Sequence, residues 1–511
     1  MNILETLFKA STADWLGLLY FFLGIIFFIT LAEKIRKALK WPSEINRKLV
    51  HILTGILIFF SPFFFTSIKP LIWIALVFIV VNYMGIRSGK LLGIHDTRRR
   101  SYGTVFYPLT FLCLVVVCWN NNKSVFMLSM LILALSDATA AIIGENLKHP
   151  HRYHLGRDKK SFEGSFIMFL VSFLIVLIGL PAVDYLDKYT ITWAAAAWIG
   201  LNTAIVATAS EALSSSGSDN ISAPIGAAFI LHFMLTHPNP MNMQLSIGIG
   251  LAILFALSSY RAHFLTANGS LCAFLLGVII FGIGGWKWTV PILTFFLTSS
   301  LLSMIGKKEK ATFRLIFEKG SRRDMGQVIA NGSVAGCIIL FNTYFPDPTW
   351  YALYLGSLAA VNSDTWATEI GVLSKSTPRS IKNFRKVIPG TSGGVTLLGL
   401  GSAFLGASII ALNGFLSAHD DYSLSFSHLF FYIIVSGGFL ASVVDSLLGS
   451  TIQAQYRCTI CNRVTEKQIH CNRSITLHVS GYRWLNNDGV NFVCSLSGGL
   501  FVWLMITLIM K

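Results

Sequence analysis

The amino-acid sequence predicts an all-α, polytopic integral membrane protein made of two tandem, distantly related helical-bundle halves. Of its 511 residues, 54% are hydrophobic and only 13% are charged, whereas about a quarter of the residues of a soluble domain are charged. Apolar runs of roughly 17–25 residues, the length that spans a bilayer as a helix, recur along the chain. Short motifs also recur in the same order in both halves. We expect about fifteen transmembrane helices.

The apolar runs give the expected helices, because a backbone in hydrocarbon must satisfy its own hydrogen bonds. The clearest runs are Trp15–Leu31, Pro70–Tyr83, Val105–Cys118, Val125–Ile143, Phe162–Leu180, Ala194–Ala212, Met243–Leu257, Leu271–Phe281, Val290–Met304, Ala352–Val372, Leu397–Leu412, Phe430–Leu448 and Val490–Met510. The expected number of spans is higher than this list because some apolar runs could hold two helices or be divided between them.

Basic residues are concentrated in short loops, and the net charge is +16. The basic segments are Lys34–Lys48, Arg87–Arg100, Lys148–Lys160, Lys307–Arg323, Arg379–Lys386 and Arg457–Arg483. The positive-inside rule places such loops in the cytoplasm, and they could also bind an anionic substrate there. We expect no nucleic-acid partner, because no binding module is visible. The first apolar segment does not resemble a cleaved signal or a transit peptide, so we expect a bacterial inner membrane.

Four pairs of elements follow the same order in the two halves, which indicates an internal repeat. They are RRSYGTV (Arg99–Val105) and RRDMGQV (Arg322–Val328), SDATAAIIG (Ser136–Gly144) and SDTWATEIG (Ser363–Gly371), SFEG from Ser161 and TSGG from Thr391, and an acid in an apolar helix, Glu211 or Asp445, followed by Asp219-Asn220 or Asn487-Asp488. The apolar pattern is interrupted at His237–Pro240, so we expect one domain at residues 1–240 and a second at 241–511.

Five acids lie inside or at the ends of apolar spans: Asp137, Glu211, Asp364, Glu369 and Asp445. A charge at the bilayer centre costs about 2.5–3.5 kcal/mol even on the most lenient scale. Each acid could pair with a Lys or Arg that snorkels from a neighbouring loop, or could hydrogen-bond to a neighbouring helix. Carboxylates also bind Mg²⁺, which usually takes one or two of them together with substrate phosphates. Together with their flanking motifs, these acids predict a site.

Carboxylate, metal, basic loop and glycine turn are the components of phosphoryl transfer. Lys and Arg would contact phosphate oxygens, and glycine turns let backbone N–H groups approach an anion. Neither half has a P-loop or a protein-kinase signature. His51 lies four residues after Arg47, on the same helix face. It could be a general base, a phosphate contact or an interfacial histidine.

A polar loop near the C-terminus carries three cysteines and a histidine. Cys458-x-x-Cys461 followed by His470-Cys471 has the ligand types and spacing of a tetrahedral zinc site. A disulfide is disfavoured in a cytoplasmic loop, and inert thiols are the alternative. A structural zinc ion would stabilise the loop that leads to Asp488 and would not catalyse.

The first half resembles the polyprenol and phytol kinase family, which includes dolichol kinase and is distantly related to CDP-diacylglycerol synthase. The resemblance covers most of residues 40–235 and is carried by RKLVH and the following TG (Arg47–His51, Thr54-Gly55), YGTVFYP (Tyr102–Pro108), SDATAAIIG, KKSFEGS (Lys159–Ser165) and EALSSSGSDNISAP (Glu211–Pro224). Ser136 and Ser363 stand where small residues or glycine are expected before the key aspartates.

The second half resembles the phytyl-phosphate kinase family over roughly residues 260–511. The motifs are RRDMGQVIANG (Arg322–Gly332), SDTWATEIG, PGTSGGVTLLG (Pro389–Gly399), VVDSLLGSTIQ (Val443–Gln453) and RWLNNDGVN (Arg483–Asn491). The two resemblances imply successive kinases that convert an isoprenoid alcohol (phytol, geranylgeraniol or farnesol) to its monophosphate and then to its diphosphate. They also imply CTP or another nucleoside triphosphate as donor, with Mg²⁺.

The candidate residues fall into three groups. Catalytic candidates are Asp137, Asp364, Glu211, Asp445 and His51. Candidate metal ligands are Asp137, Asp219, Asn220, Asp364, Glu369, Asp445 and Asp488. Candidate nucleotide or phosphate contacts are Arg47, Lys48, Arg100, Lys160, Ser161, Glu163, Gly164, Arg323, Gln327, Asn331, Thr391, Ser392 and Gly393. Two alternatives stay open: cytidylyl transfer that gives a CDP-linked prenol, and a transporter, since internal repeats with buried acids are common there.

Overall fold

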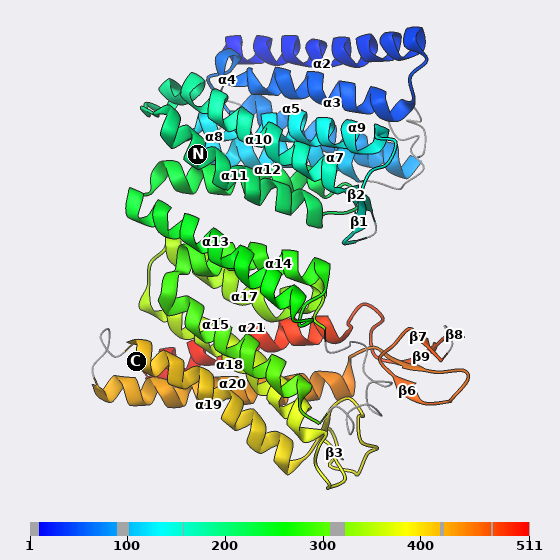
Figure 1. Ribbon diagram of the computed structural model, residues 1–511, viewed down its shortest axis with the longest axis vertical. Helices are drawn as coiled ribbons and strands as arrows, with labels where there is room; N and C mark the ends of the chain where they lie inside the picture. Colours follow the sequence, from blue (N-terminus) through cyan, green and yellow to red (C-terminus); the bar gives the residue numbers. More distant parts are fainter. Residues whose placement is uncertain are drawn as a thin grey trace. The chain divides into compact units, whose positions relative to one another are not determined.

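The computed structural model describes residues 10–88, 102–156, 158–306, 322–418, 424–471 and 474–509. The chain divides into two compact units, Met1–Asn242 and Met243–Lys511 (Figure 1). The division falls close to the expected boundary, while the activity of each half stays a prediction.

The first unit is a bundle of helices with one short hairpin (Figure 1). Its helices are α2 (Thr12–Leu39), α3 (Ser43–Phe59), α4 (Ser61–Phe64), α5 (Lys69–Ser88), α7 (Gly103–Cys118), α8 (Lys123–Leu131), η1 (Ile132–Ser136), α9 (Asp137–Asn146), α10 (Phe162–Val183), η2 (Asp184–Asp187), α11 (Trp193–Leu213) and α12 (Asp219–Thr236). Its hairpin pairs the antiparallel strands β1 (Arg152–His154) and β2 (Lys159–Ser161).

A π-helical turn interrupts the long helix at the centre of this unit. α8, η1 and α9 follow one another without a break, and η1 ends immediately before Asp137. Such turns are rare and are frequent at functional sites. The chain then passes through the β1–β2 hairpin into α10, whose first turn is capped because Ser161 Oγ accepts the Gly164 N–H at 3.1 Å. A Cβ on Gly144 would lie 2.7 Å from that Oγ atom, so glycine lets α9 pack closely on the start of α10.

The second unit is also helical. Its helices are α13 (Asn239–Arg261), which begins just before the boundary, α14 (Ala267–Gly277), η3 (Val278–Gly284), α15 (Gly285–Met304), α17 (Met325–Tyr344), α18 (Pro348–Gly371), α19 (Leu397–Ala418), α20 (Leu424–Thr451) and α21 (Asn487–Ile509). Its strands form three small sheets: β3 (Arg379–Ser380) with β4 (Gly394–Val395), β7 (Ile469–His470) with β8 (Ser474–Ile475), and β5 (Gln455–Arg457) between β6 (Val464–Thr465) and β9 (Leu477–Ser480).

Helix α18 forms the centre of this second bundle and contacts α19, α20 and α21. Its Asn362 is fully buried and donates from Nδ2 to the Gly406 carbonyl at 2.7 Å. A Cβ on Gly438 of α20 would lie 2.6 Å from Ala359 Cβ, and one on Gly498 of α21 would lie 2.3 Å from the Gly356 carbonyl oxygen. Small residues therefore let these helices approach closely, as is common between membrane helices.

Eleven helical segments of the described chain are long and apolar enough to cross a membrane. This finding confirms an all-α, polytopic membrane protein, but the expected count of about fifteen spans is not confirmed. One reason is that the expected helices 271–281 and 290–304 belong to a single continuous segment, Ala267–Met304. Another is that α18 has 24 residues and is not among the eleven, because it carries several polar side chains.

Gly498 and Gly401 form a matched pair for testing this packing. A Cβ on Gly498 would meet backbone at 2.3 Å, whereas one on Gly401 would meet no atom within 4 Å. Gly498→Ala should therefore destabilise the protein by about 1–3 kcal/mol, the usual cost of overpacking. Gly401→Ala should leave the stability unchanged or raise it by up to about 1 kcal/mol. Thermal unfolding in detergent measures both, and equal Tm values for the two variants would contradict the packing.

Candidate active site

Three carboxylates meet in the first unit. Asp137 is the first residue of α9, Glu211 lies in the last turn of α11 and Asp219 is the first residue of α12. Each offers an oxygen atom, and these oxygens lie within 4.8 Å of one another. The tertiary structure thus joins three of the predicted residues from separate motifs into one cluster.

Two largely shielded lysines pair with this cluster. Lys48 Nζ lies 2.6 Å from Asp137 Oδ2, and Lys160 Nζ lies 2.6 Å from Glu211 Oε1. The exposed fractions of these four side chains range from 8% to 17%, so both pairs are largely shielded from water. Burial alone would lower the pKa of Lys160, but the nearby carboxylates of Glu211 and Asp219 outweigh it and raise the pKa, so the ammonium group stays charged.

A cavity of about 770 Å³ opens beside the cluster. The three acids, both lysines and Arg47 line its charged part. Its apolar part is lined by residues of α2, α3, α5 and α7, namely Phe21, Ile25, Ile29, Ile58, Ile74, Phe78 and Phe111. A ligand with a charged head and a long apolar tail would match both parts, as ligand pockets combine apolar walls with a few polar groups.

His51 fixes α3 against the π-helical turn. Its Nε2 donates to the Leu133 carbonyl at 2.9 Å, so that nitrogen carries a proton. Its ring also packs edge-on against Tyr107, with centroids 4.5 Å apart. Both residues line the cavity. Tyr107 was not predicted as a site residue, although it lies in the YGTVFYP motif.

The other predicted residues of the first half have varied surroundings. Ser161 and Gly164 line the cavity, but the Gly164 N–H is used by the Ser161 cap. Glu163 instead pairs with His151 at 2.7 Å and is not among the described cavity-lining residues. Asn220 lines the cavity and donates from Nδ2 to the Gly103 carbonyl at 2.9 Å. Arg100 lies outside the described residues.

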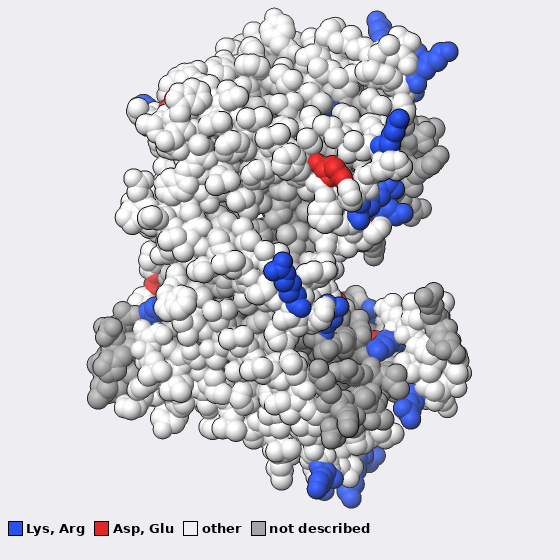
Figure 2. Space-filling model, viewed as in Figure 1, with Lys and Arg blue, Asp and Glu red and all other residues white. Residues whose placement is uncertain are grey.

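Charged side chains are distributed unevenly over the face of the molecule that Figure 2 shows. In the first unit, the Lys and Arg visible in Figure 2 lie mostly at the helix end that carries the β1–β2 hairpin and the C-terminus of α2. Lys159, Lys160 and Arg152 of this hairpin line the cavity. The charged part of the cavity therefore lies at the basic end of the bundle.

The acids of the second unit are arranged differently. Asp364 of α18 and Asp445 of α20 interact directly with each other. Within the described part of this unit, no three acids gather as closely as those of the first unit. Glu369 interacts electrostatically with Arg323, and Asp488 lies in the first turn of α21. Of the four acids predicted as metal ligands in the second half, the structure thus pairs Asp364 with Asp445, and the four do not form one cluster.

Arg323, Gln327 and Asn331 line one small cavity of about 60 Å³. The Arg323 guanidinium donates to Ser300 Oγ at 3.0 Å and lies over the rings of Phe295 and Phe296, 5.5 and 5.4 Å from their centroids. Burial lowers the pKa of Arg323 to about 10, although Glu369 opposes the shift. This cavity has room for a few water molecules and is too small for a nucleotide.

The glycine loop of the second half packs against α20. Gly393 has φ +73°, and a Cβ there would lie 2.4 Å from Ser450 Cβ. Ser392 Oγ donates to Gln453 Oε1 at 3.0 Å, and Gln453 Nε2 donates to Glu466 Oε1 at 3.0 Å. Thr391 is exposed and donates to the Ile388 carbonyl at 2.7 Å. The loop is therefore held beside the helix that carries Asp445.

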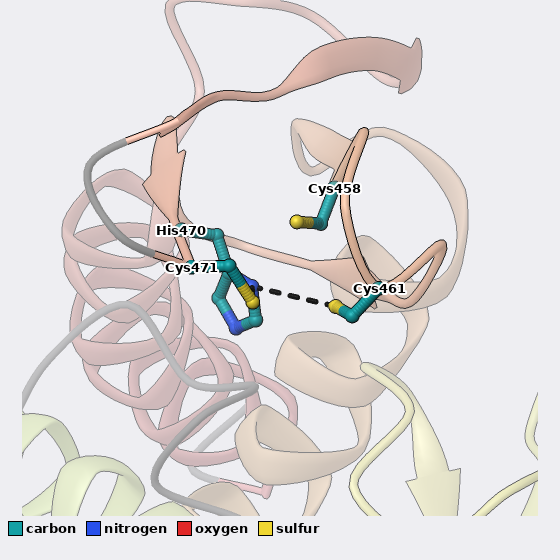
Figure 3. A group of neighbouring side chains, drawn as sticks. All are labelled: Cys458, Cys461, His470 and Cys471. Carbon is teal, nitrogen blue, oxygen red and sulfur yellow. Dashed lines mark hydrogen bonds between the residues drawn. The ribbon is translucent and has the colours of Figure 1, made fainter.

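The cysteine-rich loop brings its four predicted ligands together (Figure 3). Cys458, Cys461, His470 and Cys471 offer ligand atoms that all lie within 4.8 Å of one another. Backbone N–H groups, first that of Cys461, lower the pKa of the Cys458 thiol to about 6. The neighbouring thiols of Cys461 and Cys458, together with burial, raise the pKa of Cys471 to about 11.

Comparison with known proteins places the chain in a family. Residues 250–499 match the family described as integral membrane protein DUF92. The chain is 31% identical over 272 residues to Protein PGR of Arabidopsis thaliana, which covers 50% of this chain and 93% of that protein. It is also 30% identical over 218 residues to a phytol kinase of Synechocystis sp.. That match covers 42% of this chain and 88% of the phytol kinase.

A more distant relative is Protein VTE6, chloroplastic, of Arabidopsis thaliana, at 23% identity over 257 residues, covering 48% of this chain and 67% of that protein. No solved structure matches the chain. Over its C-terminal half, the chain therefore belongs to the DUF92 family of integral membrane proteins, and a phytol kinase is among its relatives.

Proposed function

We propose that the protein is a membrane phosphotransferase that acts on an isoprenoid alcohol. The cavity of the first unit carries the proposal, because it joins acids and lysines to an apolar wall. An isoprenoid alcohol has the same two parts, a hydroxyl group and a long apolar tail. The relative from Synechocystis sp. is named a phytol kinase, which supports a kinase of this substrate class.

The charged part of the cavity suits a nucleoside triphosphate, for which we propose CTP, together with Mg²⁺. Asp137, Glu211 and Asp219 form a set of oxygen ligands that a hard divalent cation takes. With Lys48 and Lys160 they leave one formal negative charge, so a divalent cation would make the cluster positive toward the phosphates. Bound Mg²⁺ would neutralise charge on the phosphate oxygens.

The residues of the chain would orient the alcohol and accept its proton. Lys48 and Lys160 hold two of the carboxylates in place. Asp219 forms no ion pair with a described Lys or Arg, so its carboxylate is our candidate for the general base. His51 donates to Leu133 through Nε2, and we assign it a positioning role. The reaction would depend mainly on orientation and charge neutralisation.

We propose that the second unit phosphorylates the monophosphate to the diphosphate. The motif resemblance and the contact between Asp364 and Asp445 support this step. The monophosphate is an amphiphile held in the bilayer, so two sites in one chain raise its effective concentration. We place both sites at the cytoplasmic face of a bacterial inner membrane, since the basic end of the first unit follows the positive-inside rule.

Substitution of the two aspartates tests the order of the steps. Purified Asp137→Asn, given phytol, CTP and Mg²⁺, should make monophosphate at least roughly 10²-fold more slowly, yet should still convert supplied monophosphate. Asp364→Asn should accumulate monophosphate. Asp347→Asn is the matched control, because Asp347 caps α18 by accepting from Thr349 N–H and Asn caps equally well. Product analysis by mass spectrometry measures all three.

Three outcomes would contradict this proposal. If Asp137→Asn and Asp364→Asn both keep both activities, the assignment of the sites is wrong. Release of pyrophosphate instead of CDP would indicate cytidylyl transfer. Failure to form any product in detergent, combined with substrate movement across vesicles, would indicate a transporter.

The apolar wall should determine which tail is accepted. Ile25 lines the cavity, whereas its neighbour Ile26 is 42% exposed on the outside of α2. Ile25→Trp would fill part of the space for the tail, so kcat/KM for phytol relative to the shorter farnesol should fall roughly tenfold. Ile26→Trp should leave this ratio unchanged. An equal ratio in both variants would mean that the tail binds elsewhere.

A further inference from the structure

The loop between α20 and α21 contains a set of ligands that the proposed transfer reactions do not use. It consists of Cys458, Cys461, His470 and Cys471, which we call the Cys₃His cluster (Figure 3). We propose that this cluster binds one structural zinc ion, which fixes the loop against the membrane helices of the second unit. This inference is independent of the proposed function.

Two turns present the ligands in pairs. The first pair lies in the turn between β5 and β6, where Cys458 N–H donates to the Arg463 carbonyl at 3.0 Å. Asn462 closes this turn with φ +57°. The second pair, His470 and Cys471, lies at the end of β7, where Cys471 has φ +28°. Both turns hold residues in backbone conformations that L-residues rarely adopt, and in this arrangement the ligands converge.

The four ligand atoms converge on one point. The thiols of Cys461 and Cys471 both point at His470 Nδ1, at 3.6 and 3.1 Å. Cys458 is 1% exposed and His470 is 9% exposed. None of the three cysteines forms a disulfide. Thiols gathered this closely around an imidazole nitrogen are typical of a metal site.

The chemistry of the ligands selects zinc. Three thiols and one imidazole form a closed tetrahedral set, which is typical of structural zinc, whereas Mg²⁺ and Ca²⁺ require oxygen ligands. On binding, the thiols that ligate lose their protons to solvent and the imidazole stays neutral. No coordination position is left for water, so the site would not be catalytic.

The loop is tied to the helices on both sides. Ala454 N–H donates to the Leu485 carbonyl and Tyr482 N–H donates to the Ile452 carbonyl, both at 2.9 Å. These bonds join the end of α20 to the segment just before α21. Within the same loop, Glu466 Oε1 accepts a hydrogen bond from Gln453 Nε2 at 3.0 Å. Zinc bound within this closed loop would therefore fix Glu466 and, through Gln453, the glycine loop at Ser392.

Metal analysis of the purified full-length chain tests the proposal. Mass spectrometry for metals should find about one zinc ion per chain, as a closed four-ligand site requires. Cys458→Ser and Cys461→Ser should lose most of it, whereas Cys337→Ser, which changes an exposed cysteine of α17, should keep it. His470→Cys should also keep zinc, because four thiols form an equivalent site. Equal zinc content in Cys458→Ser and Cys337→Ser would overturn the proposal.

Two further measurements keep the test valid if a cysteine variant misfolds. The wild-type chain, stripped with a chelator and loaded with Co²⁺, should show the absorption of tetrahedral thiolate coordination. Limited proteolysis within residues 453–486 should become faster after chelation and slow again when zinc is added. A disulfide among the three cysteines, iron in place of zinc, or proteolysis that is unaffected by the chelator would overturn the proposal.

Discussion

The first unit depends on two buried ion pairs, Lys48–Asp137 and Lys160–Glu211, at 2.6 Å each. Removing one partner of a buried pair usually costs about 3–5 kcal/mol, because the other charge is left without compensation. The four residues come from α3, α9, β2 and α11. Pairing therefore holds four elements that are distant in sequence at one point, and the cavity forms around that point. A π-helical turn lies directly before Asp137.

The same charges that stabilise this unit also line its cavity. Each lysine neutralises a carboxylate and keeps its ammonium group at the cavity wall. Since the pairs are shielded from water, their fields are stronger than those of surface charges. Asp219 adds a third carboxylate beside them. A divalent cation would supply the positive charge that the cluster lacks and would attract a polyphosphate, which is the physical basis of the proposed chemistry.

The second unit uses a different arrangement, although its motifs follow the same order. The carboxyl groups of Asp364 and Asp445 interact with each other, whereas Asp137 and Glu211 of the first unit each pair with a lysine. Arg323 of this unit interacts with Glu369 and lies over two aromatic rings. A hydrogen-bonded chain from Ser392 through Gln453 to Glu466 links its glycine loop to the loop that carries the Cys₃His cluster. The two units therefore share the order of their short motifs and differ in electrostatics.

The sequence alone determined the fold class and the identity of most candidate residues, because apolar runs and buried acids are local properties. It also identified the Cys₃His cluster from its spacing. Only the tertiary structure decided which residues meet: that Asp137, Glu211 and Asp219 share one point, that Lys48 and Lys160 pair with two of them, and that Glu163 pairs with His151 instead. Those contacts join residues distant along the chain, and helix packing, which no local pattern encodes, brings them together.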